Sequence, residues 1–139
     1  MIRHVLACCA LLTLTAGCQM NSRQQVLLTA NSQAAQRSIS TRYFDTGDQV
    51  AVFQGVLAAL QDLGFVVDRA DPALGTVSAT RFGNGVTRFT VTTRKGGGDR
   101  TIVRASGQVN QTELTEPAAF QQFFEGLEQA LFLQANEIG

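Results

Sequence analysis

Residues 76–109 contain the pattern that most restricts what this chain can fold into: short alternating segments joined by glycine-rich turns. In Val86–Arg94 the apolar Phe89 and Val91 alternate with polar residues, which is typical of a strand with one buried face. The Gly83-Asn84-Gly85 turn before it and the glycine run after it are typical of hairpins, which join antiparallel strands. The sequence therefore predicts an antiparallel meander with strands at Thr76–Phe82, Val86–Arg94 and Arg100–Val109.

Two other segments have helical spacing. The first begins at an N-cap residue, Thr46 or Asp48, and ends near Leu63. Gly64 follows, and glycine is common directly after the end of a helix. The second follows a cap at Thr115 or Glu116. Each carries an apolar stripe that could cover one face of a sheet, comprising Val50, Phe53, Val56, Leu57, Leu60 and Leu63 in the first helix and Phe120, Phe123, Phe124, Leu127, Ala130 and Leu131 in the second.

Two more strands, at Ser38–Phe44 and Phe65–Arg69, complete the order β-α-β-β-β-β-α. We predict an α+β fold, with an antiparallel sheet of about five strands and two amphipathic helices packed on one face. This order, together with the segment LGFVVDRADPALGTVSAT at 63–80, resembles the helix-grip-like modules of periplasmic lipoproteins in outer-membrane assembly machinery. The resemblance is one of topology and implies no particular partner.

The first 18 residues, MIRHVLACCALLTLTAGC, are expected to be a targeting segment. Arg3 and His4 precede an apolar run of about ten residues, whereas a membrane-spanning helix needs about 20. Small residues then lead to Cys18. The run therefore favours a signal peptide over a membrane span. Besides a lipoprotein signal sequence, the alternatives for this segment are an ordinary cleaved signal peptide and a retained membrane anchor.

The end of this segment, Thr15-Ala16-Gly17-Cys18, resembles the lipobox of bacterial lipoproteins, with Thr15 at a position that is usually Leu. The resemblance implies cleavage before Cys18, diacylglycerol on its sulfur and an N-acyl chain. More than one acyl chain gives stable anchoring. Gln19, where an Asp would favour the inner membrane, implies the periplasmic face of the outer membrane of a Gram-negative envelope.

We expect three parts in the chain: signal peptide at 1–17, a lipidated cysteine with a mostly flexible tether at 18–37, and a single periplasmic domain at 38–139. The tether is rich in Gln, Asn, Ser and Ala, although Val26–Gln36 could form a short helix. All three cysteines lie within the first 18 residues, so a processed chain would keep only Cys18. A conventional core must then stabilise the domain without a disulfide.

The residue inventory argues against most catalytic and metal sites. Without His4 the processed chain has no histidine, which excludes the usual Ser-His-Asp and Cys-His machinery and histidine-ligated zinc. Paired carboxylates could serve a hydrolase, but turn aspartates usually bind backbone donors. We expect no enzyme, cofactor or metal. The carboxylate pairs considered are Asp45 and Asp48, Asp68 and Asp71, and Glu125 and Glu128.

Charge is unevenly distributed, although eleven basic residues balance eleven acidic ones and disfavour a nucleic-acid partner. Residues 81–104 carry six basic residues and one acidic residue, whereas residues 105–139 carry five acidic residues and no basic one. Arg88 and Arg94 share the strand face opposite Phe89, and Arg104 lies on the next strand. Together they form either an ordinary solvated face or a surface for an anionic partner.

The sequence thus favours a lipid-anchored periplasmic protein that acts as a binding or structural accessory subunit of an envelope complex. Its partners would be the membrane, through the lipid, and an envelope protein. A carrier of an apolar ligand, lined by the phenylalanines of the last helix, is the first alternative. A small carboxylate-based hydrolase is the second.

Overall fold

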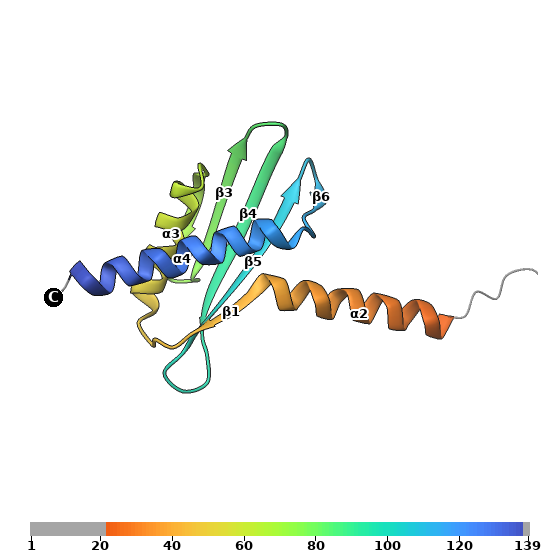
Figure 1. Cartoon of the computed structure of the whole chain (residues 1–139), viewed down its shortest axis with the longest axis horizontal. Coiled ribbons are helices and arrows are strands. Elements are labelled where there is room, and N and C mark those ends of the chain that lie inside the picture. The colour runs from red at the N-terminus through yellow and green to blue at the C-terminus, as the bar shows by residue number, and fades with distance from the viewer. Residues whose placement is uncertain (1–21, 138–139) are drawn as a thin grey trace, which may run out of the picture. The chain divides into compact units, whose positions relative to one another are not determined.

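The computed structural model describes residues 22–137, so the predicted signal peptide and Cys18 lie outside the described residues. The chain divides into one unit that ends at Ala34 and a second unit, Ala35–Gly139. Helix α2 (Ser22–Ser40) contains residues of both units (Figure 1). The packing described below belongs to the second unit. None of the helices in residues 22–137 is both long enough and apolar enough to cross a membrane.

An antiparallel sheet forms the centre of the second unit, with the strand order β1-β5-β4-β3-β2 (Figure 1). A short sixth strand pairs with β5 at the end that β1 does not reach. The strands are β1 (Thr41–Phe44), β2 (Val66–Asp71), β3 (Thr76–Phe82), β4 (Val86–Lys95), β5 (Thr101–Val109) and β6 (Thr112–Glu113). The predicted meander is therefore confirmed, and the first strand returns to pair with the last long one.

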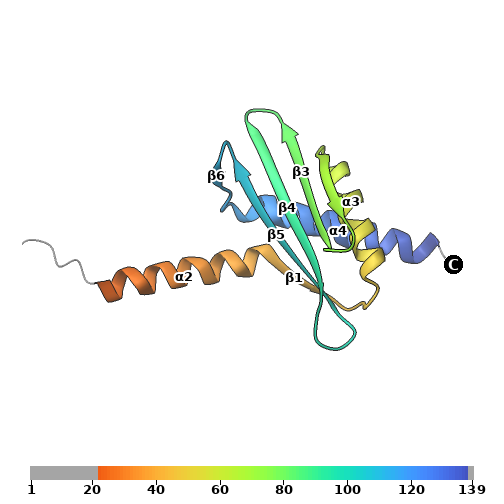
Figure 2. The same ribbon diagram turned by 180° about the vertical axis from the view of Figure 1, so that it is seen from behind.

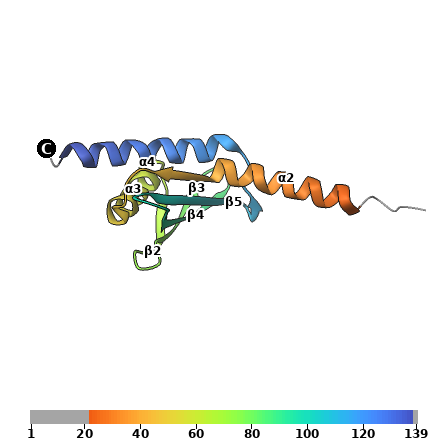
Figure 3. The ribbon, with the colours of Figure 1, turned by 90° about the horizontal axis from the view of Figure 1, so that it is seen from below.

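Helices α3 (Gln49–Asp62) and α4 (Pro117–Glu137) both pack on one face of this sheet (Figures 2 and 3). Asp48 caps α3, because its Oδ1 accepts a hydrogen bond from the Ala51 amide at 3.0 Å. Gly64 ends the same helix with φ +80°, a conformation that glycine adopts at little cost. The predicted α+β class, with two helices on one face, is confirmed.

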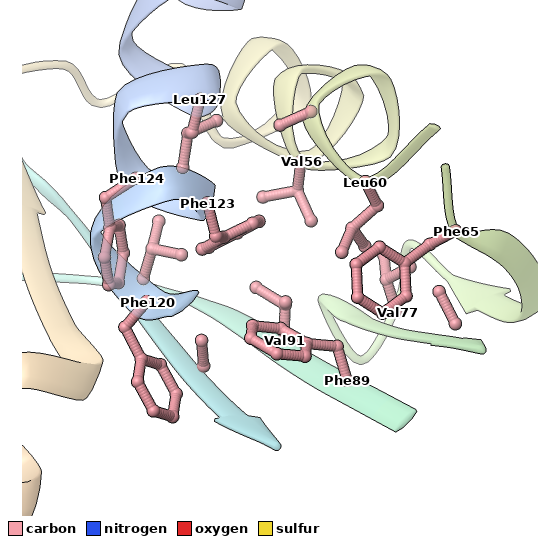
Figure 4. Packing of buried hydrophobic residues seen from close by; sticks show 14 of the residues in the cluster. Val56, Leu60, Phe65, Val77, Phe89, Val91, Phe120, Phe123, Phe124 and Leu127 are labelled. Carbon is pink, nitrogen blue, oxygen red and sulfur yellow. The ribbon is translucent and has the colours of Figure 1, made fainter. Parts of the chain in front are cut away.

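Aromatic side chains fill the space between the helices and the sheet (Figure 4). Phe89 of β4 is 2% exposed, and its ring lies 5.3 Å from Phe65, 5.6 Å from Phe120 and 6.0 Å from Phe123 between centroids. Such tilted pairs add to the free energy gained by burial. Three of the four phenylalanines of α4 are thus core residues, whereas Phe132 is 68% exposed.

The structure corrects three details of the prediction. Helix α2 occupies Ser22–Ser40, longer than the short helix considered within the tether, so the first strand begins at Thr41 and not at Ser38. Arg42 stabilises this helix end by donating to the Ser38 carbonyl at 2.9 Å. Val50 was placed on the buried stripe of α3 but is exposed, because the buried face of this helix runs through Val52, Val56 and Ala59. Strand β6 lies between the last predicted strand and the last predicted helix, where no strand was predicted.

Candidate functional site

The sheet face opposite α3 and α4 is the candidate site, and we call it the open face. Side chains alternate along each strand, so residues adjacent to buried core positions point away from the helices. The register between neighbouring strands determines which residues lie side by side on this face. Arg104 of β5 lies between Thr41 of β1 and Thr92 of β4, and Ile102 of β5 lies between Tyr43 of β1 and Arg94 of β4. Its other members on the two central strands are Arg88, Thr90, Ser106 and Gln108.

Two of the three predicted arginines meet on this face. Arg94 and Arg104 occupy diagonal positions on β4 and β5, and both line one hollow of about 530 Å³. Arg88 lies six residues from Arg94 along the same strand, about 20 Å away at ~3.4 Å per residue. Arg88 borders different hollows, beside Gln108 and Glu113. The structure therefore separates the predicted set into a close pair and a single distant residue.

A third arginine, missed by the sequence analysis, lines the same hollow as Arg94 and Arg104. Arg37 lies in the last turn of α2, four residues before β1 begins. Pairing of β1 with β5 then brings the end of this helix beside Arg104. The sequence offered one weak signal, since a basic residue in a last helical turn is favoured by the helix dipole.

The four remaining arginines of the second unit have partners within the protein. Arg42 lies 5.1 Å from the Phe124 ring and donates to the carbonyls of Ser38 and Thr41. Arg81 lies 4.7 Å from the Phe65 ring and donates to the Leu63 carbonyl. Arg69 pairs with Asp71 at 3.8 Å, and Arg100 lies 5.8 Å from the Tyr43 ring.

By contrast, Arg37, Arg88, Arg94 and Arg104 make no hydrogen bond, ion pair or cation–π contact with the other described residues. All four are exposed. The arginines of the second unit therefore fall into four that contact other groups of the protein and four that make no such contact with the described residues. The second set lies on or beside the open face.

Four of the six carboxylates considered for catalysis accept hydrogen bonds within the fold. Asp48 and Asp71 accept from backbone amides at 3.0 Å each, as expected for turn aspartates. Asp68 accepts from the Thr80 hydroxyl at 2.6 Å, and Glu125 accepts from the Gln121 amide at 2.8 Å. Within residues 22–137 no group of three or more His, Cys, Asp or Glu side chains is arranged to hold a metal ion.

Comparison with known proteins finds no family model that matches this chain, and no curated protein matches it. The open face must therefore be interpreted from its own chemistry.

Proposed function

We propose that this chain is a lipid-anchored binding module on the periplasmic face of the outer membrane, acting as an accessory subunit of an envelope complex. The lipobox-like Thr15-Ala16-Gly17-Cys18 supports the anchor. The open face supports the binding role, because it carries exposed arginines that form no ion pair with the acidic side chains of residues 22–137. This last observation carries the proposal.

The physical chemistry of arginine makes an anionic partner the natural choice. A guanidinium has five donors in a planar fork that fits carboxylates and phosphates, and it keeps its charge at any periplasmic pH. Hydroxyl groups of Thr90 and Thr92 lie between the arginines and can donate to the same partner, whereas the Ser106 hydroxyl donates to the Thr90 carbonyl at 3.4 Å. Acidic protein surfaces, lipopolysaccharide phosphates and peptidoglycan carboxylates all carry suitable groups.

The packing of the core supports a surface role over that of an apolar-ligand carrier. The side chains of the α4 residues Phe120, Phe123 and Phe124 pack against other buried residues of the domain. These three side chains therefore form part of the core. A carrier would instead need apolar side chains that line a space for the ligand. The open face offers polar and charged groups in an accessible position.

The test is capture of partners from native membranes through a C-terminal tag, comparing the wild-type chain with an Arg88→Gln, Arg94→Gln, Arg104→Gln triple variant. These residues are exposed, so the variant should fold normally by circular dichroism. We expect the triple variant to lose most of the captured material, because exchange to Gln removes three charges. An Arg23→Gln, Arg69→Gln variant is a control for loss of positive charge elsewhere. Capture by the triple variant at the wild-type level would refute the proposal.

A further inference from the structure

We propose that Arg37, Arg94 and Arg104 form a binding site for a phosphate monoester group, with Arg37 as its unrecognised third member. This inference rests on the proposed function, since it names the anionic group that the open face recognises. The site is the hollow of about 530 Å³, which is lined by Arg37, Ser38, Thr41, Tyr43, Thr92, Arg94, Ile102 and Arg104.

Three separate elements of the fold each contribute one arginine to the hollow. Arg37 comes from α2, Arg94 from β4 and Arg104 from β5. The sheet positions the backbone of the last two, because Arg104 is flanked by Thr41 of β1 and Thr92 of β4, and Arg94 pairs with Ile102 of β5. Three like charges around one hollow repel each other, so a bound anion would relieve that repulsion.

The three arginines form no ion pair with the other described residues. Other arginines of the second unit contact a ring, a carbonyl or a carboxylate, whereas these three make no such contact with the described residues. No Asp or Glu lines the hollow. A phosphate monoester, with about two negative charges at neutral pH, matches three guanidinium groups better than a single carboxylate does.

Hydroxyl groups also line the hollow beside the arginines. Thr41 and Thr92 flank Arg104 on either side, and Ser38 lies at the end of α2. Their hydroxyls can donate to phosphate oxygens that the guanidinium groups leave unbound. The Ser38 hydroxyl donates to the Ala35 carbonyl at 2.7 Å, so Thr41 and Thr92 are the donors available in this structure.

Tyr43 and Ile102 indicate that the phosphate is carried by a larger body. Tyr43 is 63% exposed beside the hollow, and Arg100 lies over its ring at 5.8 Å. Ile102 lies between Tyr43 and Arg94 in the same row. A sugar ring fits such an apolar and aromatic surface next to an anion site.

The experiment measures binding of glucose 6-phosphate, glucuronate and glucose to the purified full chain by isothermal titration calorimetry. Glucuronate presents a carboxylate on the same ring, and glucose presents no charge. We expect glucose 6-phosphate to bind at least several-fold more tightly than glucuronate, because a second charge engages another guanidinium. No heat with any of the three, or tighter binding of glucuronate, would overturn the inference.

Arg88→Gln is the matched control, since it removes the same charge from the same face about 20 Å from Arg94. We expect Arg37→Gln, Arg94→Gln and Arg104→Gln each to weaken glucose 6-phosphate binding about tenfold, the loss of one charge-assisted hydrogen bond, and Arg88→Gln by less than twofold. Equal weakening by Arg88→Gln and Arg94→Gln would mean a diffuse field without a site, and it would overturn the inference.

A second arm identifies the source of the phosphate monoester. Vesicles of phosphatidylcholine with phosphatidic acid carry the group on a lipid, and pure phosphatidylcholine vesicles do not. Binding to phosphatidic acid that Arg94→Gln abolishes supports the site with a lipid as its source. If a glutamate-rich peptide binds while neither glucose 6-phosphate nor phosphatidic acid does, the phosphate site is refuted and an acidic protein is the partner.

The two proposals can fail separately. Wild-type envelope capture by the triple variant, alongside normal binding of glucose 6-phosphate to the wild-type chain, would refute the proposed function and keep the site. Lost capture by the triple variant, with no phosphate binding by the wild-type chain, would refute the site and keep the function.

Discussion

Truncating Phe89 to Ala should destabilise the domain more than any surface change, and the structure sets the magnitude. Phe89 is 2% exposed and contacts the rings of Phe65, Phe120 and Phe123, so it joins both sides of the core. Removing a buried Phe costs about 3–5 kcal/mol through lost burial and the cavity left behind. The three ring pairs favour the upper half of that range, since each pair contributes ~0.5–1.5 kcal/mol beyond its buried area.

The assay is urea unfolding of the full chain, followed by circular dichroism. Phe82→Ala is the matched control, because Phe82 lies on the neighbouring strand and is 72% exposed. We expect the control to change the free energy of unfolding by less than about 0.5 kcal/mol. Should Phe89→Ala fail to fold, Phe89→Leu provides the measurement, with an expected loss of about 1–2 kcal/mol. A loss below ~1 kcal/mol for Phe89→Ala, or equal losses for Phe89→Ala and Phe82→Ala, would refute the account of the core.

Three further changes test single features. Asp48→Ala removes the cap that accepts from Ala51 and should cost about 1 kcal/mol in urea unfolding, so an unchanged midpoint would contradict the capping role. Gly75→Ala should cost at least ~1 kcal/mol, because φ is +63° and the new Cβ would meet the Thr93 carbonyl; a more stable variant would argue against this turn. Cys18→Ser should move the chain from the membrane fraction to the soluble fraction, and its retention in the membrane would rule out a lipid anchor on that sulfur.

The parts of the fold that were predicted correctly depend on local periodicity. In β4 the alternation around Phe89 and Val91 separates the buried face from the open face over ten residues. The apolar stripe of α4 identifies Phe120 and Leu127 as core in the same way. Because these patterns repeat every two or 3.6 residues, a short window of sequence carries them.

The end of α2 was harder to predict because residues 22–40 lack an apolar stripe. Its helix is consistent with the favourable propensities of Ala, Gln, Leu and Arg, which are weak signals one at a time. The strand expected at Ser38 begins three residues later for this reason.

The candidate site was predicted in part. Arg94 and Arg104 follow from one hairpin, whose short loop fixes the register between β4 and β5. Arg37 could not be placed, because it reaches the hollow through pairing of β1 with β5, strands about 60 residues apart in the chain. The distance between Arg88 and Arg94 likewise became known only once both residues were placed on the single strand β4.

Site-specific photo-crosslinking in living cells reports which face of the domain touches its partner. A photoreactive amino acid at Thr90 would sit in the middle of the open face, and one at the exposed Gln122 would sit on α4 across the sheet. We expect crosslinks from Thr90 that are lost in the Arg94→Gln, Arg104→Gln background, and none from Gln122. Crosslinks from Gln122 alone would contradict it.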